Sequence, residues 1–270
     1  MGEQAWHGHT IDVTTPSAAR MYDWLLGGSN NYVADRLAGE ELLKIAPSTR
    51  ELALQNREFL MRVVEHIVRE HRITQFIDHG SGLPTQDNVH QVAQRVNPES
   101  RVVYVDNDPI VLSHGRTLLR QDERVEILQT DMSDTDAIFG NERVTNLLDL
   151  SKPTAALFVS VLHCLPDEDD PAGLLRRTAE RLTPGSVMVI CQLVSEDQAV
   201  RDGVTNLMKA TARWGRVRTE QEVNAYFDGL EVKEPGLMDV TFWRPDGKLL
   251  PRQRTREWIE YGGLAVIPER

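Results

Sequence analysis

Hydrophobic residues recur every three or four positions through the first 72 residues, as they do on one face of an α-helix. Residues 18–26 form one such stretch and residues 33–45 form a second. A third and longer stretch follows Ser48. The first 16 residues show no such pattern and are expected to be frayed. We therefore expect residues 1–72 to form a helical cap or lid without strands.

The pattern changes at Ile73, where short apolar runs begin to alternate with amphipathic stretches of helical period. Continuous apolar runs are typical of strands that are buried on both faces of a parallel sheet. The expected strands span residues 73–78, 101–105, 125–129, 154–161 and 186–194. The expected helices span residues 86–96, 109–119, 141–148, 172–182, 197–214 and 219–227. Two further runs, 236–243 and 263–267, have no helix between them and predict an antiparallel pair that closes the sheet.

This alternation predicts an α/β fold with a Rossmann-like, doubly wound sheet over residues 73–270. Ligands of such sheets bind at the carboxyl ends of the strands, and here polar residues follow the expected strands. They are Asp78, His79, Gly80, Ser81 and Gly82 after the first strand, Asp106 and Asn107 after the second, and Asp131 and Met132 after the third. Gly80 and Gly82 lack a Cβ, so a ligand can lie against their backbone. Asp106 follows Gly82 by 24 residues, about where an acid meets ribose hydroxyls, which predicts a nucleoside-containing cofactor.

Two residues of the glycine-rich loop help to identify that cofactor. A dinucleotide fingerprint has a third glycine where this chain has Thr85, and Pro84 has no N–H to offer a pyrophosphate. Both features argue against NAD and FAD. S-adenosyl-L-methionine carries ribose and adenine but no phosphate, so it does not need those donors. Asp131 could accept a hydrogen bond from the adenine amine, and Met132 could pack on the ring.

The segment from Phe76 to Thr85 resembles motif I of class I S-adenosylmethionine-dependent methyltransferases. More narrowly, the chain is similar to an actinobacterial family of such methyltransferases, most of them without known substrates. The stretches that carry this similarity are residues 19–28, 35–36, the glycine-rich loop through residues 88–90, and residues 103–109. The similarity covers most of the chain.

The resemblance implies a seven-stranded sheet whose last strand is antiparallel. It implies S-adenosyl-L-methionine as cofactor and S-adenosyl-L-homocysteine as product. Gly80 and Gly82 would then line the methionine end of the cofactor, and Asp106 would take both ribose hydroxyls. Asp131 and Met132 would flank the adenine.

The resemblance also implies that the segment after the fourth strand, with Ser160 and Val161, passes beneath the methionine moiety. His79 departs from the family pattern, because many class I enzymes carry a small or apolar residue at this position. Asp78 has two plausible roles, which are orienting the glycine-rich loop or touching the cofactor amine through a water molecule.

The N-terminal segment offers further candidates. Arg20, Tyr22 and Asn30 could reach the carboxylate of the cofactor or close over it, because a lid is needed to exclude water from the reacting sulfonium. The alternative is that this segment only packs on the sheet. The sequence does not identify a catalytic residue. Tyr22 and His163 are the candidates, with His163 as a general base, and the alternative for His163 is a residue at the rim of the site.

Composition and charge narrow the class of partner. The chain has 270 residues, 30 Lys and Arg, 41 Asp and Glu, and a net charge of -11, which disfavours a nucleic-acid binder. The basic cluster at 201–218 would be a solvated helix face or would favour an acidic acceptor. Cys164 and Cys191 form no disulfide framework, and the pair His163 and Cys164 lacks further ligands for a zinc site, so we expect no metal.

The chain begins without the charged and apolar regions of a signal peptide, and its longest apolar run is too short to span a bilayer. We therefore expect a cytoplasmic protein that binds no membrane, and the oligomeric state is not predicted. The sequence favours a methyltransferase that acts on an unidentified small-molecule acceptor. The alternatives are a non-catalytic regulator that binds S-adenosylmethionine or its product, and an NAD-dependent oxidoreductase.

Overall fold

The computed structural model describes residues 3–6, 9–84, 87–119, 122–212, 214–247 and 257–269. Thr85 and Gln86, where the sequence lacks the third glycine and where a helix was expected to start, lie outside the described residues. No helix among the described residues is long and apolar enough to cross a membrane.

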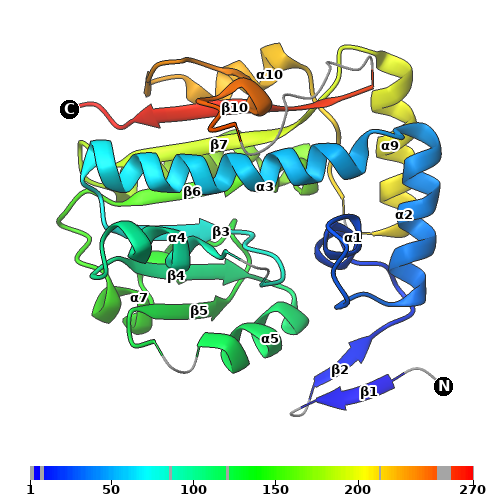
Figure 1. Cartoon of the computed structure of the whole chain (residues 1–270), viewed down its shortest axis with the longest axis horizontal. Helices are drawn as coiled ribbons and strands as arrows, with labels where there is room; N and C mark the ends of the chain where they lie inside the picture. The colour runs from blue at the N-terminus through cyan, green and yellow to red at the C-terminus, as the bar shows by residue number, and fades with distance from the viewer. Residues whose placement is uncertain are drawn as a thin grey trace.

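One mixed sheet forms the centre of the molecule (Figure 1). Its long strands are β3 (Gln75–His79), β4 (Arg101–Asp106), β5 (Val125–Gln129), β6 (Ala155–Val159), β7 (Val187–Val194) and β10 (Ile259–Val266). They lie in the order β5-β4-β3-β6-β7-β10, and the first five are parallel. The last strand, β10, runs antiparallel to β7 along its whole length, from Ile259 opposite Val194 to Val266 opposite Val187. The predicted fold class, with its antiparallel last strand, is confirmed.

The edge of the sheet beside β10 differs from the sequence prediction in detail. The short strands β8 (Glu231–Val232) and β9 (Met238–Asp239) both pair with β10, which brings the sheet to eight strands in the described part of the chain. The run 236–243 was expected to be one strand, but the chain turns after Asp239, whose carboxylate accepts a hydrogen bond from the backbone N–H of Thr241. A 3-10 turn at Val240–Phe242 follows.

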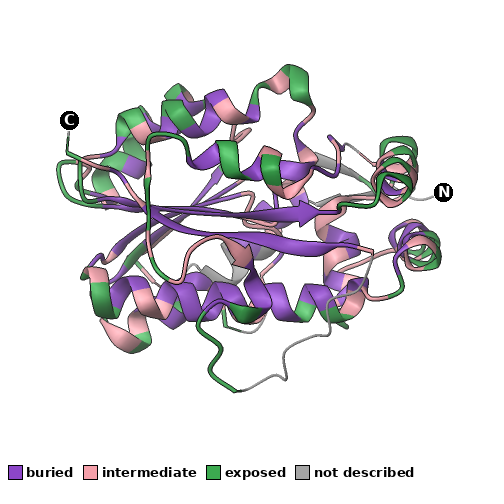
Figure 2. Ribbon diagram, turned by 90° about the horizontal axis from the view of Figure 1, so that it is seen from above, coloured by how far each residue is buried: buried purple, intermediate pink, exposed green. Residues whose placement is uncertain are grey.

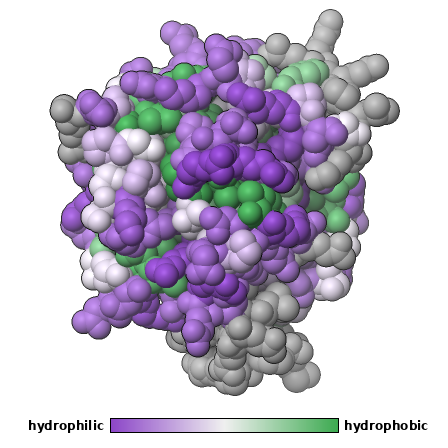
Figure 3. Space-filling view, turned by 60° about the vertical axis from the view of Figure 1, so that its left-hand side comes forward, coloured by the Kyte–Doolittle hydropathy of each residue, from purple (hydrophilic) through white to green (hydrophobic). Residues whose placement is uncertain are grey.

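Helices cover both faces of the sheet, and the buried strands form the layer between them (Figure 2). One face is covered by α3 (Thr49–His66), α4 (Val89–Val96) and α5 (Pro109–Leu119), with a π-helical turn at Ile67–His71 after α3. The other is covered by α6 (Thr135–Phe139), α7 (Glu142–Leu147), α8 (Pro171–Arg181) and α10 (Glu220–Asn224). Polar side chains cover most of the surface shown in Figure 3, where apolar side chains form only small separate areas.

The N-terminal residues contribute to two different parts of the molecule. The long helix α3 runs across the sheet, and its side chains Phe59, Val63 and Val64 are fully buried in one core cluster with strands β3, β4, β6 and β7. By contrast, α1 (Ala18–Leu25) and α2 (Val33–Ile45) lie beyond the carboxyl ends of the strands, together with α9 (Gln198–Thr211). The residues expected to be frayed include a hairpin of β1 (Glu3–Trp6) and β2 (His9–Asp12).

Candidate functional site

A cavity of about 460 Å³ lies at the carboxyl ends of the parallel strands, with α1 and α2 on its outer side. Most of the residues singled out in the sequence line it. They are Asp78, Gly80, Ser81, Gly82, Asp106, Asn107, Asp131, Met132, Ser160 and Val161, together with Tyr22 and His163. Arg20, Asn30 and His79 do not belong to this lining. The topology of a doubly wound sheet thus brings together residues that lie far apart in the sequence.

The glycine-rich loop after β3 has a backbone that favours glycine at two positions. Gly80 and Gly82 both have φ +66, a left-handed conformation that costs other L-residues about 1 kcal/mol or more. A Cβ on Gly80 would meet Cγ2 of Val161 at 2.2 Å, whereas a Cβ on Gly82 would meet nothing within 4 Å. Gly80 therefore lets the loop pack against the end of β6, and Gly82 leaves open space on the cavity side.

Asp106 at the end of β4 is tied to this loop. Its Oδ2 accepts a hydrogen bond of 2.8 Å from the backbone N–H of Gly82, and its Oδ1 accepts one of 2.9 Å from Asp108. Each carboxylate oxygen has a further lone pair, so the half-buried side chain can accept two more hydrogen bonds from a ligand. Burial raises the pKa of Asp106 to about 6, although the N–H groups of Asp108 and Gly82 pull it down.

Asp78 lies at the end of β3 and is almost fully buried in the cavity wall. Burial raises the pKa of its carboxyl group to about 7, the nearby Arg57 lowers it and the nearby Asp106 raises it further. Two neighbouring carboxyl groups with raised pKa values favour a positively charged ligand, which would stabilise their ionised forms.

The ends of β5 and β6 complete this half of the cavity. The Oδ1 atom of Asp131 accepts hydrogen bonds from the backbone N–H and the hydroxyl of Ser133, which orient the carboxylate beside Met132. Asp108, by contrast, caps α5, since its carboxylate accepts a hydrogen bond of 2.8 Å from the N–H of Ile110. Ser160 has φ +57, and its backbone N–H donates to the carbonyl oxygen of Cys191 on β7.

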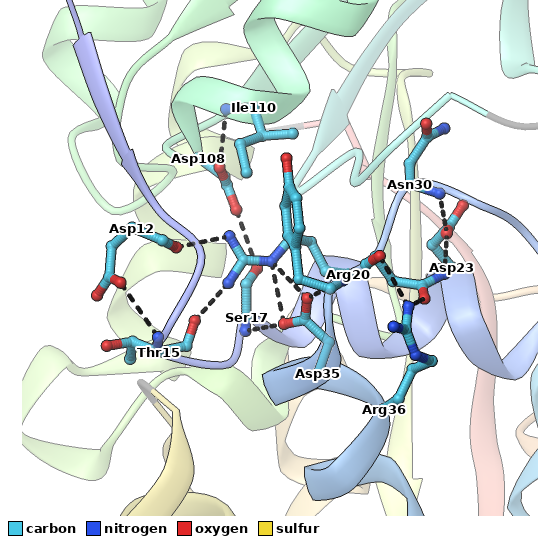
Figure 4. A network of polar contacts seen from close by, with 12 residues as sticks. Asp12, Thr15, Ser17, Arg20, Asp23, Asn30, Asp35, Arg36, Asp108 and Ile110 are labelled. Carbon is cyan, nitrogen blue, oxygen red and sulfur yellow. Dashed lines mark hydrogen bonds and ion pairs between the residues drawn. The ribbon is translucent and has the colours of Figure 1, made fainter. Parts of the chain in front are cut away.

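Arg20 and Asp35 form an ion pair that ties the N-terminal segment together (Figure 4). Both side chains are buried, and their Nε and Oδ2 atoms are 2.9 Å apart. The guanidinium also donates to the carbonyl oxygens of Asp12 and Thr15, and Asp35 accepts from the N–H groups of Ser17 and Tyr32. This pair therefore holds the stretch whose residues 15–19 line the cavity.

Two further contacts anchor this segment. The hydroxyl of Ser17 donates to Asp108 Oδ2 at 2.9 Å, which links the segment to the start of α5. The turn after α1 is held by Asp23, whose Oδ2 accepts from the backbone N–H of Asn30 and the side-chain amide of Asn31, each at 2.8 Å. Arg20 and Asn30 thus support the cavity wall through other residues.

The two catalytic candidates are both held by protein groups. The Tyr22 hydroxyl donates to the carbonyl oxygen of Ala53 at 3.1 Å and accepts from Asn56 Nδ2 at 3.0 Å, and burial raises its pKa to about 12. The Nδ1 atom of His163 faces the N–H of Leu193 at 3.3 Å. Burial, aided by Arg218, lowers the pKa of His163 to about 3, so the ring is neutral and carries its proton on Nε2. This arrangement makes His163 a hydrogen-bond donor and argues against its role as a general base.

His79 lies beneath the cavity and is fully buried. Its ring stacks on Phe158, with ring centroids 4.2 Å apart, and burial lowers its pKa to about 4. A neutral, flat imidazole therefore fills a core position of the sheet, where many class I enzymes carry a small or apolar residue.

Glu260 is a cavity residue that the sequence reasoning missed. It lies on β10, it is 2% exposed, and its Oε1 contacts the hydroxyl of Ser160. The signal was present, because Glu260 is the one charged residue in the otherwise apolar strand Ile259–Val266. Arg57 on α3 and the indole side chains of Trp214 and Trp258 also line the cavity without having been predicted.

The described lining carries six acids and one permanently charged base, Arg57. The acids are Asp23, Asp78, Asp106, Asp108, Asp131 and Glu260. Such a lining fits a ligand with positive charge and offers little to a phosphate. The start of α4 is also occupied by its own side chains, because Gln91 Oε1 accepts a hydrogen bond of 2.8 Å from the N–H of Asn88. A pyrophosphate would need that helix N-terminus.

Comparison with known proteins agrees with this geometry. A model of the S-adenosyl methyltransferase family matches residues 4–268. The chain is 36% identical to a candidate methyltransferase from Thermobifida fusca, with a TM-score of 0.90 over 96% of this chain and 97% of that one. It is also 36% identical to a DUF574 family protein from Streptomyces avermitilis, with a TM-score of 0.88 over 95% and 99% of the two chains. No curated protein matches the chain significantly. The chain belongs to the S-adenosyl methyltransferase family.

Proposed function

We propose that this protein binds S-adenosyl-L-methionine in the cavity and transfers its methyl group to a small-molecule acceptor. The observation that carries the proposal is the link between Asp106 and Gly82. The link holds the oxygens of the half-buried carboxylate in the cavity wall beside Gly82, where an added Cβ would meet nothing within 4 Å. Ribose hydroxyls are suitable partners for those oxygens.

Charge favours this cofactor over a dinucleotide. S-adenosyl-L-methionine carries a sulfonium and an ammonium group, which suit a lining with six acids and one permanently charged base among its described residues. NAD and FAD carry a pyrophosphate, for which Pro84 and the self-capped start of α4 offer no N–H.

The chain's own residues would bind, orient and shield the reacting groups. Asp106 would fix the ribose, and Asp131 and Met132 would hold the adenine. The N-terminal segment that Arg20 and Asp35 hold in place would exclude water. When bound, S-adenosyl-L-methionine supplies a methyl group that its positively charged sulfur already activates. The protein therefore has to supply orientation and, for a nucleophile that carries a proton, a proton acceptor.

Isothermal titration of S-adenosyl-L-homocysteine into the wild type and the Asp106→Asn variant tests the proposal. The variant loses the carboxylate charge and one acceptor, and each charge-assisted hydrogen bond contributes about 1.5–3 kcal/mol. We expect its affinity to fall about ten- to hundredfold or more. Asp149→Asn is a matched control, because Asp149 also accepts from the N–H two residues ahead, at Ser151, but does not line the cavity. Unchanged affinity in Asp106→Asn would contradict the assignment.

Formation of S-adenosyl-L-homocysteine in the presence of candidate acceptors tests the second half of the proposal. A protein that binds the cofactor tightly but releases no S-adenosyl-L-homocysteine with any acceptor would instead be a regulator of the same fold. Binding of NAD with no binding of S-adenosyl-L-methionine would overturn the cofactor assignment altogether.

A further inference from the structure

The cavity has a second half that the cofactor-binding residues do not form. The strands β6 and β7 end on this side, the antiparallel β10 begins there, and α9 lies across it. Its wall is apolar, with Leu42 from α2, Leu193 from β7, Met208 from α9 and the indole rings of Trp214 and Trp258. These side chains belong to one hydrophobic cluster, separate from the cluster near the glycine-rich loop. One cavity, of about 460 Å³, would take both the cofactor and the acceptor.

A buried carboxylate lies among these apolar groups. Glu260 lies opposite Leu193 on the neighbouring strand and is held at Oε1 by the hydroxyl of Ser160. Ser160 stands directly after β6 in a left-handed conformation. A buried acid carries a large desolvation cost, which is tolerated where it has a function. The switch point of this sheet lies between β3 and β6, and the contact with Ser160 directly after β6 brings Glu260 close to it.

Three other polar side chains in this half, those of Tyr22, His163 and Trp214, are unsuited to accept a proton. Tyr22 already donates to Ala53 and accepts from Asn56. His163 presents an N–H, as its contact with Leu193 requires. Within the described part of the chain, the indole N–H of Trp214 has no hydrogen-bond partner, although this side chain is only 8% exposed. It is a second hydrogen-bond donor and cannot accept a proton.

The charges in this half disfavour an anionic acceptor. From the sequence, the basic cluster at 201–218 could have bound an anionic acceptor. In the structure, however, two of its arginines form ion pairs with acids of the protein. Arg216 pairs with Asp167 and Glu222, and Arg218 is buried against the same Asp167. Arg213 lies outside the described residues. Arg57 on α3 is the one Lys or Arg among the described lining residues, and six acids of the same lining oppose its charge.

We propose that this apolar half binds a small neutral phenol and that Glu260 is the catalytic residue that accepts the phenolic proton, with Ser160 as its positioning residue. This inference rests on the proposed function. In the step, a lone pair of the phenolic oxygen forms the bond to the methyl carbon, and the carbon–sulfur bond breaks with its electron pair on sulfur. The phenolic proton passes to Glu260 and leaves later to water, so the products are a methyl ether and a neutral thioether.

The test uses the full chain saturated with S-adenosyl-L-homocysteine and the fluorescent probe 2-naphthol. This neutral, two-ring phenol becomes strongly acidic when excited, and in an apolar site that excludes water it emits as naphtholate only where a proton acceptor touches its hydroxyl. We expect bound 2-naphthol to quench the tryptophan fluorescence of the protein and to emit as naphtholate. 2-Naphthoate has the same rings and a negative charge, and we expect it to bind at least tenfold more weakly.

Two variants separate the roles of charge and position. Glu260→Gln should retain affinity for S-adenosyl-L-homocysteine within about twofold and shift the emission of bound 2-naphthol to the naphthol band. Glu231→Gln is the matched control, because Glu231 is an exposed acid on the neighbouring strand β8 and pairs with Lys233. Its emission should match the wild type. Leu42→Lys should abolish 2-naphthol binding while S-adenosyl-L-homocysteine still binds.

The remaining outcomes distinguish failure of the proposed function from failure of the acceptor inference. If the wild type does not bind S-adenosyl-L-homocysteine, the proposed function fails. If it binds S-adenosyl-L-homocysteine but not 2-naphthol, or binds 2-naphthoate equally well, the acceptor inference alone is overturned. Naphtholate emission that persists in Glu260→Gln overturns the role of this residue. Loss of S-adenosyl-L-homocysteine binding in Glu260→Gln does so too, because it would assign Glu260 to the cofactor.

Discussion

Asp78 illustrates how a buried acid in the cavity wall can oppose folding. Its pKa is raised from the ordinary value of 3.8 to about 7, chiefly because the side chain is buried. The folded protein therefore holds this proton more tightly than the unfolded chain does. The contribution of Asp78 to the free energy of unfolding consequently falls as the pH rises from about 4 to about 7. This rise in the pKa corresponds to at most about 4 kcal/mol of unfolding free energy.

Asp78→Asn should therefore stabilise the ligand-free protein at pH 8 and leave it nearly unchanged at pH 4. Since 1 kcal/mol moves the melting temperature of a protein of this size by about 2–4 °C, a gain of several degrees at pH 8 is expected. Melting curves across this pH range would measure it. Asp149→Asn is the control. It should not become more stable relative to the wild type as the pH rises, because hydrogen bonds, above all the one from the Ser151 side chain, lower the pKa of Asp149 to about 2. If the melting temperatures of the wild type and of Asp78→Asn changed with pH in parallel, the buried carboxyl group of Asp78 would not oppose folding.

The residues that the sequence could identify are those whose chemistry is local. Gly80 and Gly82 could be singled out because only their neighbours in the chain define the loop, and Asp106 because its distance from the loop follows from the fold. Glu260 follows the loop by well over a hundred residues and reaches the cavity through an antiparallel strand. Nothing local in the sequence predicts its contact with Ser160. Trp214 and Trp258 reach the same wall only through tertiary packing.

At the scale of elements, the central strands could be predicted because a strand that is buried on both faces appears in the sequence as a continuous apolar run. The strand β5 and the helices α2 and α5 match their predicted bounds. The strand β8 has only two residues, both exposed, and it has no apolar pattern to recognise. The run at 236–243 is apolar, but the capping contact of Asp239 turns it after two residues. Local contacts of this kind set the bounds of short elements, and the spacing of apolar residues in the sequence does not.

The ion pair of Arg20 and Asp35 joins α1, α2 and the segment before them, so its loss should loosen an element rather than a single contact. Removal of one partner of a buried pair leaves an uncompensated charge and typically costs about 3–5 kcal/mol. We expect Asp35→Asn to accelerate amide hydrogen exchange in residues 12–32 and to weaken the binding of S-adenosyl-L-homocysteine.

Glu41→Gln is the control for that variant, because it removes an acid of the same helix whose pair with Lys44 is exposed. Its effect on unfolding should stay within about 0.5 kcal/mol, and its exchange pattern should match that of the wild type. If Asp35→Asn left exchange in residues 12–32 and ligand affinity as they are in the wild type, the segment would not depend on this pair.

At the scale of the whole molecule, the long helix α3 decides where the lid ends and the core begins. The sequence pattern suggested a boundary at residue 72, where the strands start. In the structure, however, α3 covers one face of the sheet, and its fully buried residues include Phe59, Val63 and Ile67. The helices α1 and α2 instead line the cavity and pack near α9. We therefore expect the functional boundary to lie before Thr49.

Two truncations test this boundary. A chain that lacks residues 1–47 keeps both layers around the sheet, and we expect it to unfold cooperatively but at a lower temperature, because Leu193 and Trp258 lose their cover. It should not bind S-adenosyl-L-homocysteine, since one wall of the cavity is gone. A chain that lacks residues 1–72 also loses α3 and exposes a whole apolar face of the sheet, so it should aggregate or melt without cooperativity. Cooperative melting of the chain that lacks residues 1–72 would return the boundary to residue 72. Ligand binding by the chain that lacks residues 1–47 would show that the site does not need these residues.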